Sequence, residues 1–150
     1  MTAAWQAFEY EVQMFYETRA RLRDRSVDGI LRNALVESSL LHTRILVDAL
    51  LRRSGKPDDV TLAQLLPAAA SSGGLQASLD RLRQAYGAHD QRDTPCWILN
   101  KRLAHLTSVR GDSFDYSALY AALDPLIGET LRQVAQIAGR TLMANYCRGD

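Results

Sequence analysis

The residues with types and spacing best suited to catalysis lie in one segment, which contains Trp97, Lys101, Arg102, His105 and Arg110. On a helix, Lys101 and Arg102 lie about one turn before His105. Neighbouring cations favour the neutral form of a histidine. A neutral imidazole can act as a general base while an arginine holds a phosphate, as metal-independent RNA cleavage requires. The alternative interpretation is that His105 packs on Trp97 or bonds a backbone carbonyl.

A second group of polar residues surrounds His42. Ser38, His42 and Ile45 follow each other at helical spacing within an apolar pattern, so the pattern predicts a buried imidazole. Burial without a hydrogen bond costs about 1–3 kcal/mol, so we expect a partner, either Ser38 or a group on a neighbouring helix. The adjacent stripe holds Glu37, Arg44 and Asp48, of which the last two have the four-residue spacing of a helical ion pair. The default interpretation is a core histidine beside a solvated charged face.

The sequence predicts neither a metal site nor a cofactor. No two histidines have helical ligand spacing, and Cys96 and Cys147 form no CxxC or Cys/His cluster. Gly73 and Gly74 are followed by Leu75 and not by the residues of a phosphate-binding loop. Nucleotide hydrolysis therefore has no support in the sequence.

Composition limits the class of protein. The 150 residues include 18 Lys and Arg against 17 Asp and Glu, a net charge of +1. This length predicts one domain over residues 1–150, and the charge balance argues against a strongly basic nucleic-acid binder. No apolar run has the length of a membrane span or a signal peptide. We expect a cytoplasmic protein without a membrane partner, and any RNA contact should be local.

The elements that position these residues are expected to be helices, because Leu and Ala number 42 and Val and Ile 12. The fold class predicted is all-α, a single-domain up-and-down bundle of about five to six helices. Pro125 is expected to kink or split the last helix near Leu123. The apolar and capping patterns place the helices at about 3–25, 28–53, 61–66, 75–86, 96–109 and 116–146.

Two segments resemble a group of bacterial helical proteins similar in outline to the HEPN superfamily. The first runs from Glu37-Ser38 through His42 and Arg44 to Asp48, as in an ESxxxHxRxLxD helix. The second contains Asn100-Lys101, Ala104-His105 and Arg110, as in an NKxxAHLTxxR helix. The resemblance implies a helical bundle, often a homodimer, in which Asn100 and His105 line a cleft near a two-fold axis.

The resemblance also indicates a departure from the active enzymes. Active HEPN ribonucleases carry an Arg shortly before the cleft histidine, whereas Ile98, Leu99 and Asn100 precede His105 here. The first hypothesis is therefore a non-catalytic, dimerising module that binds RNA, a nucleotide or a protein. In it, Glu37, His42, Arg44, Asn100 and His105 form a polar network between the second and fifth helices. The second is a metal-independent ribonuclease of the toxin or antiphage type, with His105 as base and Arg102 and Arg110 holding the phosphate.

Two further surface features bear on partners. The aromatic residues predict more apolar surface than one small bundle covers, which favours a homodimer; they are Trp5, Phe8, Tyr16, Trp97 and Tyr116. The basic end of the first helix alternates at every second residue, from Arg19 to Arg25. Such spacing spreads side chains around a helix, so a solvated end is expected there.

Overall fold

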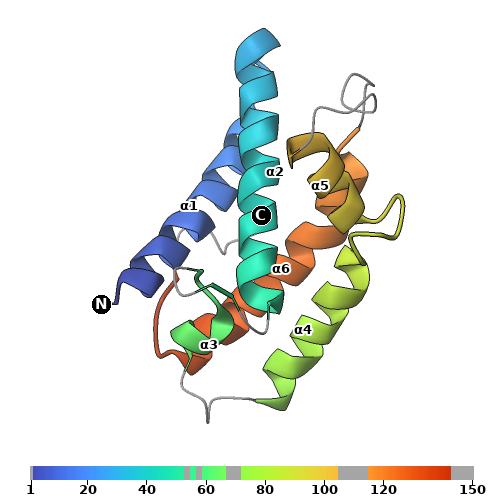
Figure 1. Ribbon diagram of the computed structural model, residues 1–150. Coiled ribbons are helices and arrows are strands. Elements are labelled where there is room, and N and C mark those ends of the chain that lie inside the picture. The colour runs from blue at the N-terminus through green and yellow to red at the C-terminus, as the bar shows by residue number, and fades with distance from the viewer. Residues whose placement is uncertain (1, 53–54, 57–58, 67–71, 105–114, 143–150) are drawn as a thin grey trace. The chain divides into compact units, whose positions relative to one another are not determined.

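The computed structural model describes residues 2–52, 55–56, 59–66, 72–104 and 115–142. All regular secondary structure in these ranges is helical, which confirms the all-α prediction (Figure 1). The helices belong to two compact units, one with α1 to α3 and the other with α4 to α6. The single domain and the HEPN-like topology stay predictions. No helix within the described ranges combines the length and the apolar character needed to cross a membrane.

The first unit is built on two long antiparallel helices, α1 (Ala3–Arg23) and α2 (Gly29–Leu51) (Figure 1). Thr2 caps α1 by accepting a hydrogen bond from the backbone N–H of Trp5 at 3.4 Å. The two helices bury a common apolar core, which includes Phe8, Val12, Phe15, Leu46 and Leu50.

A short helix, α3 (Leu62–Leu65), closes one end of this helix pair. Thr61 and Gln64 form a reciprocal capping box at its start, as the sequence order permits. The indole Nε1 of Trp5 donates to the backbone carbonyl of Leu65 at 3.1 Å. This buried bond ties α3 to the first turn of α1.

The second unit consists of α4 (Gly73–Tyr86), α5 (Pro95–Ala104) and α6 (Ser117–Ile137). α4 and α6 pack together along their apolar faces, which bury Leu75, Leu79 and Leu82 on α4 and Leu123, Ile127 and Leu131 on α6. Ser72 caps α4, and Pro95 is the first residue of α5, where its missing N–H costs nothing.

The last helix bears on two expectations, one at Pro125 and one at its C-terminal end. Pro125 lies inside α6 without splitting it. Its turn is exposed at Ala121 and Pro125, so water can bond the carbonyl that loses its partner. The helix ends at Ile137, earlier than predicted, because Gly139 takes a φ of +62°. The N–H of Arg140 then bonds the carbonyl of Ala135 at 2.9 Å, which forms a Schellman end.

Candidate functional site

His42 bonds a residue of the neighbouring helix. Its Nδ1 lies 2.6 Å from Oε2 of Glu11 on α1, and the two side chains are 9% and 20% exposed. Because a carboxylate only accepts, Nδ1 is the donor. The ring also meets Tyr10 edge-on, with centroids 6.1 Å apart. The imidazole is therefore buried and partnered, and the partner is a group on a neighbouring helix, the second of the two alternatives.

A second polar contact crosses between the same helices. Arg19, expected in solvent, is buried, and its Nη2 donates to Oγ1 of Thr43 at 2.7 Å. The guanidinium also lies 5.0 Å from the ring centroid of Phe15. Thr43 is itself fully buried and donates to the carbonyl of Ser39 at 2.7 Å. The two-residue spacing of the arginines did not indicate that Arg19 is buried while the arginines that follow it are exposed.

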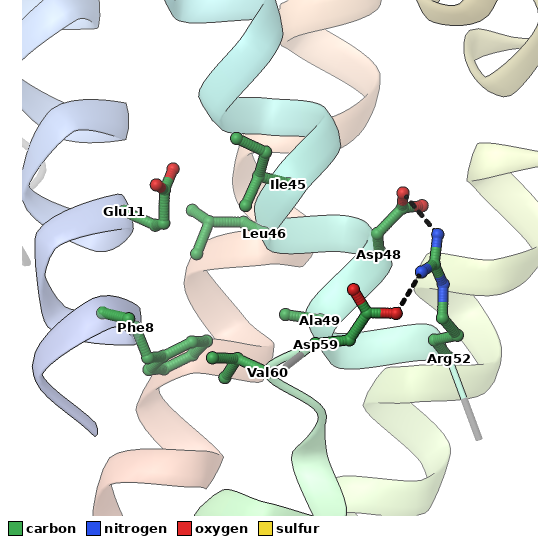
Figure 2. A pocket seen from close by; sticks show the side chains of 10 residues that line it. Phe8, Glu11, Ile45, Leu46, Asp48, Ala49, Arg52, Asp59 and Val60 are labelled. Atoms are coloured by element: carbon green, nitrogen blue, oxygen red, sulfur yellow. Dashed lines mark hydrogen bonds and ion pairs between the residues drawn. The ribbon is translucent and has the colours of Figure 1, made fainter. Parts of the chain in front are cut away.

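A pocket of about 330 Å³ opens within the first unit beside Glu11, the partner of His42. The apolar part of its lining is formed by Ala7 and Phe8 of α1, by Ile45, Leu46 and Ala49 of α2, and by Val60 (Figure 2). The volume lies at the lower end of the range of about 300–1,000 Å³ typical of small-molecule sites.

Four charged residues complete the pocket lining: Glu11, Asp48, Arg52 and Asp59. Arg52 contacts Asp48 at 3.2 Å and Asp59 at 3.1 Å (Figure 2). Burial raises the pKa of the Asp48 carboxyl, and Asp59 adds to the rise, whereas Arg52 and Arg44 act in the opposite direction. Asp48 therefore pays a desolvation cost that the two arginines do not cancel.

The segment after α2 holds Asp59 in place. Oδ2 of Asp59 accepts from the backbone N–H of Lys56 at 2.9 Å, and its own N–H donates to the Lys56 carbonyl at 3.0 Å. A Cβ at Gly55 would lie only 2.7 Å from that of Asp59. Glycine thus permits the close turn that keeps this carboxylate at the pocket.

The first half of α2 carries apolar side chains that the structure leaves exposed. Ile30, Ala34 and Leu41 share one face of the helix, because they are four and seven residues apart. Ile30 is 88% and Leu41 46% exposed. We call these three residues the α2 stripe. The aromatic residues expected to form excess surface are instead buried or half-buried.

The second unit contains Asn100, whose side-chain amide donates to the carbonyl of Cys96, one turn earlier on α5, at 3.0 Å. Trp97, on the same helix, has the guanidinium of Arg92 at 5.9 Å from its ring centroid. Arg102 belongs to α5 by its backbone. The side chain of Arg102, together with His105 and Arg110, lies outside the described residues.

The polar residues chosen from the sequence thus fall in different places. His42, Arg44 and Asp48 share α2 with Glu37, which is exposed. His42 bonds Glu11, which lines the pocket, and Asp48 lines the pocket itself. A network that joins α2 to Asn100 stays a prediction. Among the described residues, no three His, Cys, Asp or Glu side chains lie together as metal ligands.

Glu11, Arg52 and Asp59 were not chosen from the sequence. Only the position of Glu11 on the helix that packs against α2 makes it the partner of His42. Asp59 lies in the segment 55–60, whose course no periodicity predicts. The four-residue spacing of Asp48 and Arg52 was the available signal.

Fold and site together define an all-helical protein with a small acidic pocket and an exposed apolar helix face. No family model, curated protein or solved structure matches the chain.

Proposed function

We propose that the chain is a HEPN-like helical binding module that acts as a homodimer and lacks an intact nuclease motif. The HEPN-like part rests on the two sequence motifs around His42 and His105, and the absence of cleavage rests on the missing Arg before His105. The α2 stripe is the observation that supports association of two copies of the chain. Exposed apolar side chains on one helix face indicate a contact surface, and an isoleucine that is 88% exposed is costly in water.

The charges on the same helix face as the α2 stripe favour a second copy as its occupant. Glu37 and Arg44 are seven residues apart, so they lie on the same side of α2, and they carry opposite charge. In an antiparallel two-fold pair of helices, the same sides face each other. Glu37 of one copy can then lie beside Arg44 of the other, twice in each dimer. A face of this kind is self-complementary, as an isologous contact requires.

The charge balance bears on a partner other than a second copy. RNA-binding surfaces are basic and bind phosphates, whereas the chain has a net charge of +1. A protein is therefore favoured over RNA or a nucleotide as a further partner.

The test of the dimer is its mass in solution, measured by light scattering at several concentrations. The wild type should have twice the chain mass, and Ala34→Glu should be a monomer because the added carboxylate would be buried among the apolar side chains of the α2 stripe. Ala77→Glu is the matched control, since it adds the same charge at another exposed helical alanine. A monomeric wild type would contradict the dimer, and would equally remove any active site shared across a two-fold axis.

The proposal that the protein does not cleave RNA has a separate test. Purified wild type should leave structured and single-stranded RNA intact in EDTA, and His105→Ala should behave identically. Cleavage by the wild type that the variant lacks would replace this proposal with the metal-independent ribonuclease, with Arg102 and Arg110 as the next residues to substitute.

A further inference from the structure

We propose that the pocket of one copy of the chain receives the side chain of Ile30 from a second copy. This inference rests on the proposed homodimer and deepens it, because it names the contact that fills each pocket. It joins two features of the first unit, the exposed N-terminal end of α2 and the pocket beside Glu11.

Ile30 lies far from the pocket of its own chain. Sixteen residues of α2 separate it from Leu46, which lines the pocket, and this separation is about 24 Å along the helix. All residues from 28 to 34 are exposed, and Ile30 is the most exposed of the large apolar residues. A direct contact between Ile30 and the pocket is therefore a contact between two copies.

The pocket reaches the same face of α2 that carries Ile30. Ile30 and Asp48 are eighteen residues apart, which is five full turns of an α-helix. Asp48 lines the pocket together with Ile45 and Arg52 (Figure 2). A second copy that packs on the α2 stripe therefore lies against the side of the pocket that Asp48 forms.

The charges of α2 set the level at which the two copies face each other. With Glu37 of one copy beside Arg44 of the other, the two-fold axis passes α2 midway between these residues. Ile30 lies about 16 Å before this midpoint, and the pocket residues Asp48 and Arg52 lie about 11 and 17 Å after it. In an antiparallel pair, Ile30 of one copy is therefore level with the pocket of the other.

The same register gives both charged α2 residues of the pocket a suitable polar group on the other copy. Asp28 is exposed, and its side chain makes no capping bond at the start of α2. This carboxylate lies at the level of Arg52 of the other copy. Asn33 lies at the level of Asp48, and a side-chain amide can donate to a carboxylate. The register derived from Glu37 and Arg44 therefore places no like charges opposite these two residues.

The pocket suits an aliphatic side chain. Its apolar lining includes Phe8 of α1, Ile45 and Ala49 of α2, and Val60. Burial of Ile30, which is 88% exposed in the single chain, removes its apolar surface from water twice in each dimer. Side chains that are buried in a pocket of the partner contribute much of the binding free energy of an interface. We therefore expect Ile30 to be a main contact of the dimer.

The first test compares the dissociation constants of the wild-type, Ile30→Ala and Ile30→Leu dimers by sedimentation equilibrium. Ile30→Ala should weaken the dimer at least about tenfold, because it removes apolar contacts in two pockets. Ile30→Leu is the matched control, since it keeps the apolar volume, and it should dissociate as the wild type does. A dimer that Ile30→Ala leaves unchanged would overturn this inference and leave the proposed dimer in place, whereas a monomeric wild type would contradict both.

A double-mutant cycle locates the contact of Ile30. Ala7 is exposed at the edge of the pocket, so Ala7→Phe can fill the space without replacing a core residue. We expect Ala7→Phe to weaken the dimer, and Ile30→Ala to add little further loss in that background. Residues in contact have non-additive effects and distant residues have additive ones, and these two positions are distant within one chain.

Ala77→Phe is the matched control for the cycle, because it adds the same ring at an exposed alanine of α4. It should leave the dissociation constant unchanged, and circular dichroism should show the same helical content in all variants. Additive effects of Ala7→Phe and Ile30→Ala, or a dimer that Ala7→Phe does not weaken, would place Ile30 outside the pocket and overturn the inference.

Discussion

At the scale of single residues, the bond between His42 and Glu11 explains how a polar ring is accommodated on the buried face of α2. The sequence alone predicted the burial, because His42 continues an apolar pattern, and predicted that a partner must exist. It did not identify Glu11, since that choice depends on which turn of α1 packs opposite His42. Local spacing predicts contacts within a helix and not contacts across two helices.

Removal of the imidazole should therefore destabilise the protein. His42→Ala leaves the partly buried Glu11 carboxylate without its donor, and we expect a loss of about 1–3 kcal/mol in the free energy of unfolding. Thermal denaturation should show a fall in Tm of several degrees. His89→Ala is the matched control because His89 is exposed. A Tm for His42→Ala within one degree of the wild type would contradict a structural role of this bond.

The raised pKa of Asp48 predicts a pH-dependent contribution to stability. A carboxyl whose pKa is higher in the folded than in the unfolded state stabilises the fold at low pH, and this contribution is lost as pH rises through the folded pKa. Asp48→Asn removes that loss. Relative to the wild type, its free energy of unfolding should increase from about pH 4 up to the raised pKa and then level off.

Asp24 supplies a control of opposite sign for this measurement. Hydrogen bonds from the side chain and backbone of Ser26 lower the pKa of Asp24, so its contribution is present at higher pH and is lost as pH falls. Below about pH 4, Asp24→Asn should lose stability relative to the wild type as the pH rises. Chemical denaturation from pH 3 to 7 measures this change. The same pH trend in both variants would contradict the environments assigned to the two carboxyls.

At the scale of elements, the sequence predicted the helix positions well where stop signals were recognised. Pro95 marked the start of α5, and Gly87 the end of α4. The end of α6 was missed, because the apolar pattern continues past Gly139, and the glycine was not read as the helix end. Exposure along α2 was also missed, since periodicity does not reveal how far a neighbouring helix extends.

The glycine at the end of α6 can be tested directly. Gly139→Ala places a Cβ in open space, so any loss of stability comes from the backbone, which has a φ of +62°. We expect a loss of about 1–2 kcal/mol by chemical denaturation. Gly73→Ala, at the first residue of α4, also meets no neighbour and should be neutral or stabilise by up to about 1 kcal/mol. Equal effects of the two variants would indicate that the Schellman end contributes nothing.

At the scale of the whole molecule, the pocket, the polar contacts and the predicted site residues are divided between the two units. The first unit holds the pocket, the bond between His42 and Glu11, and the α2 stripe. The second unit holds Asn100, while the expected catalytic residues His105 and Arg110 lie outside the described residues. Composition predicted the all-α class because it sums over every helix. It had no means of predicting a pocket, which depends on side chains from three separate segments.

A dimer held by the α2 stripe has a consequence for the stability of the whole protein. When a folded dimer unfolds to two separate chains, mass action makes its Tm rise with protein concentration. For a chain of this size, each tenfold increase should raise Tm by about 1–4 °C. Scanning calorimetry over a hundredfold range of concentration should show this rise in the wild type and in Ala77→Glu. Ala34→Glu should have a Tm independent of concentration, because its folded state is already a single chain. A constant Tm in all three proteins would contradict an association that contributes to folding.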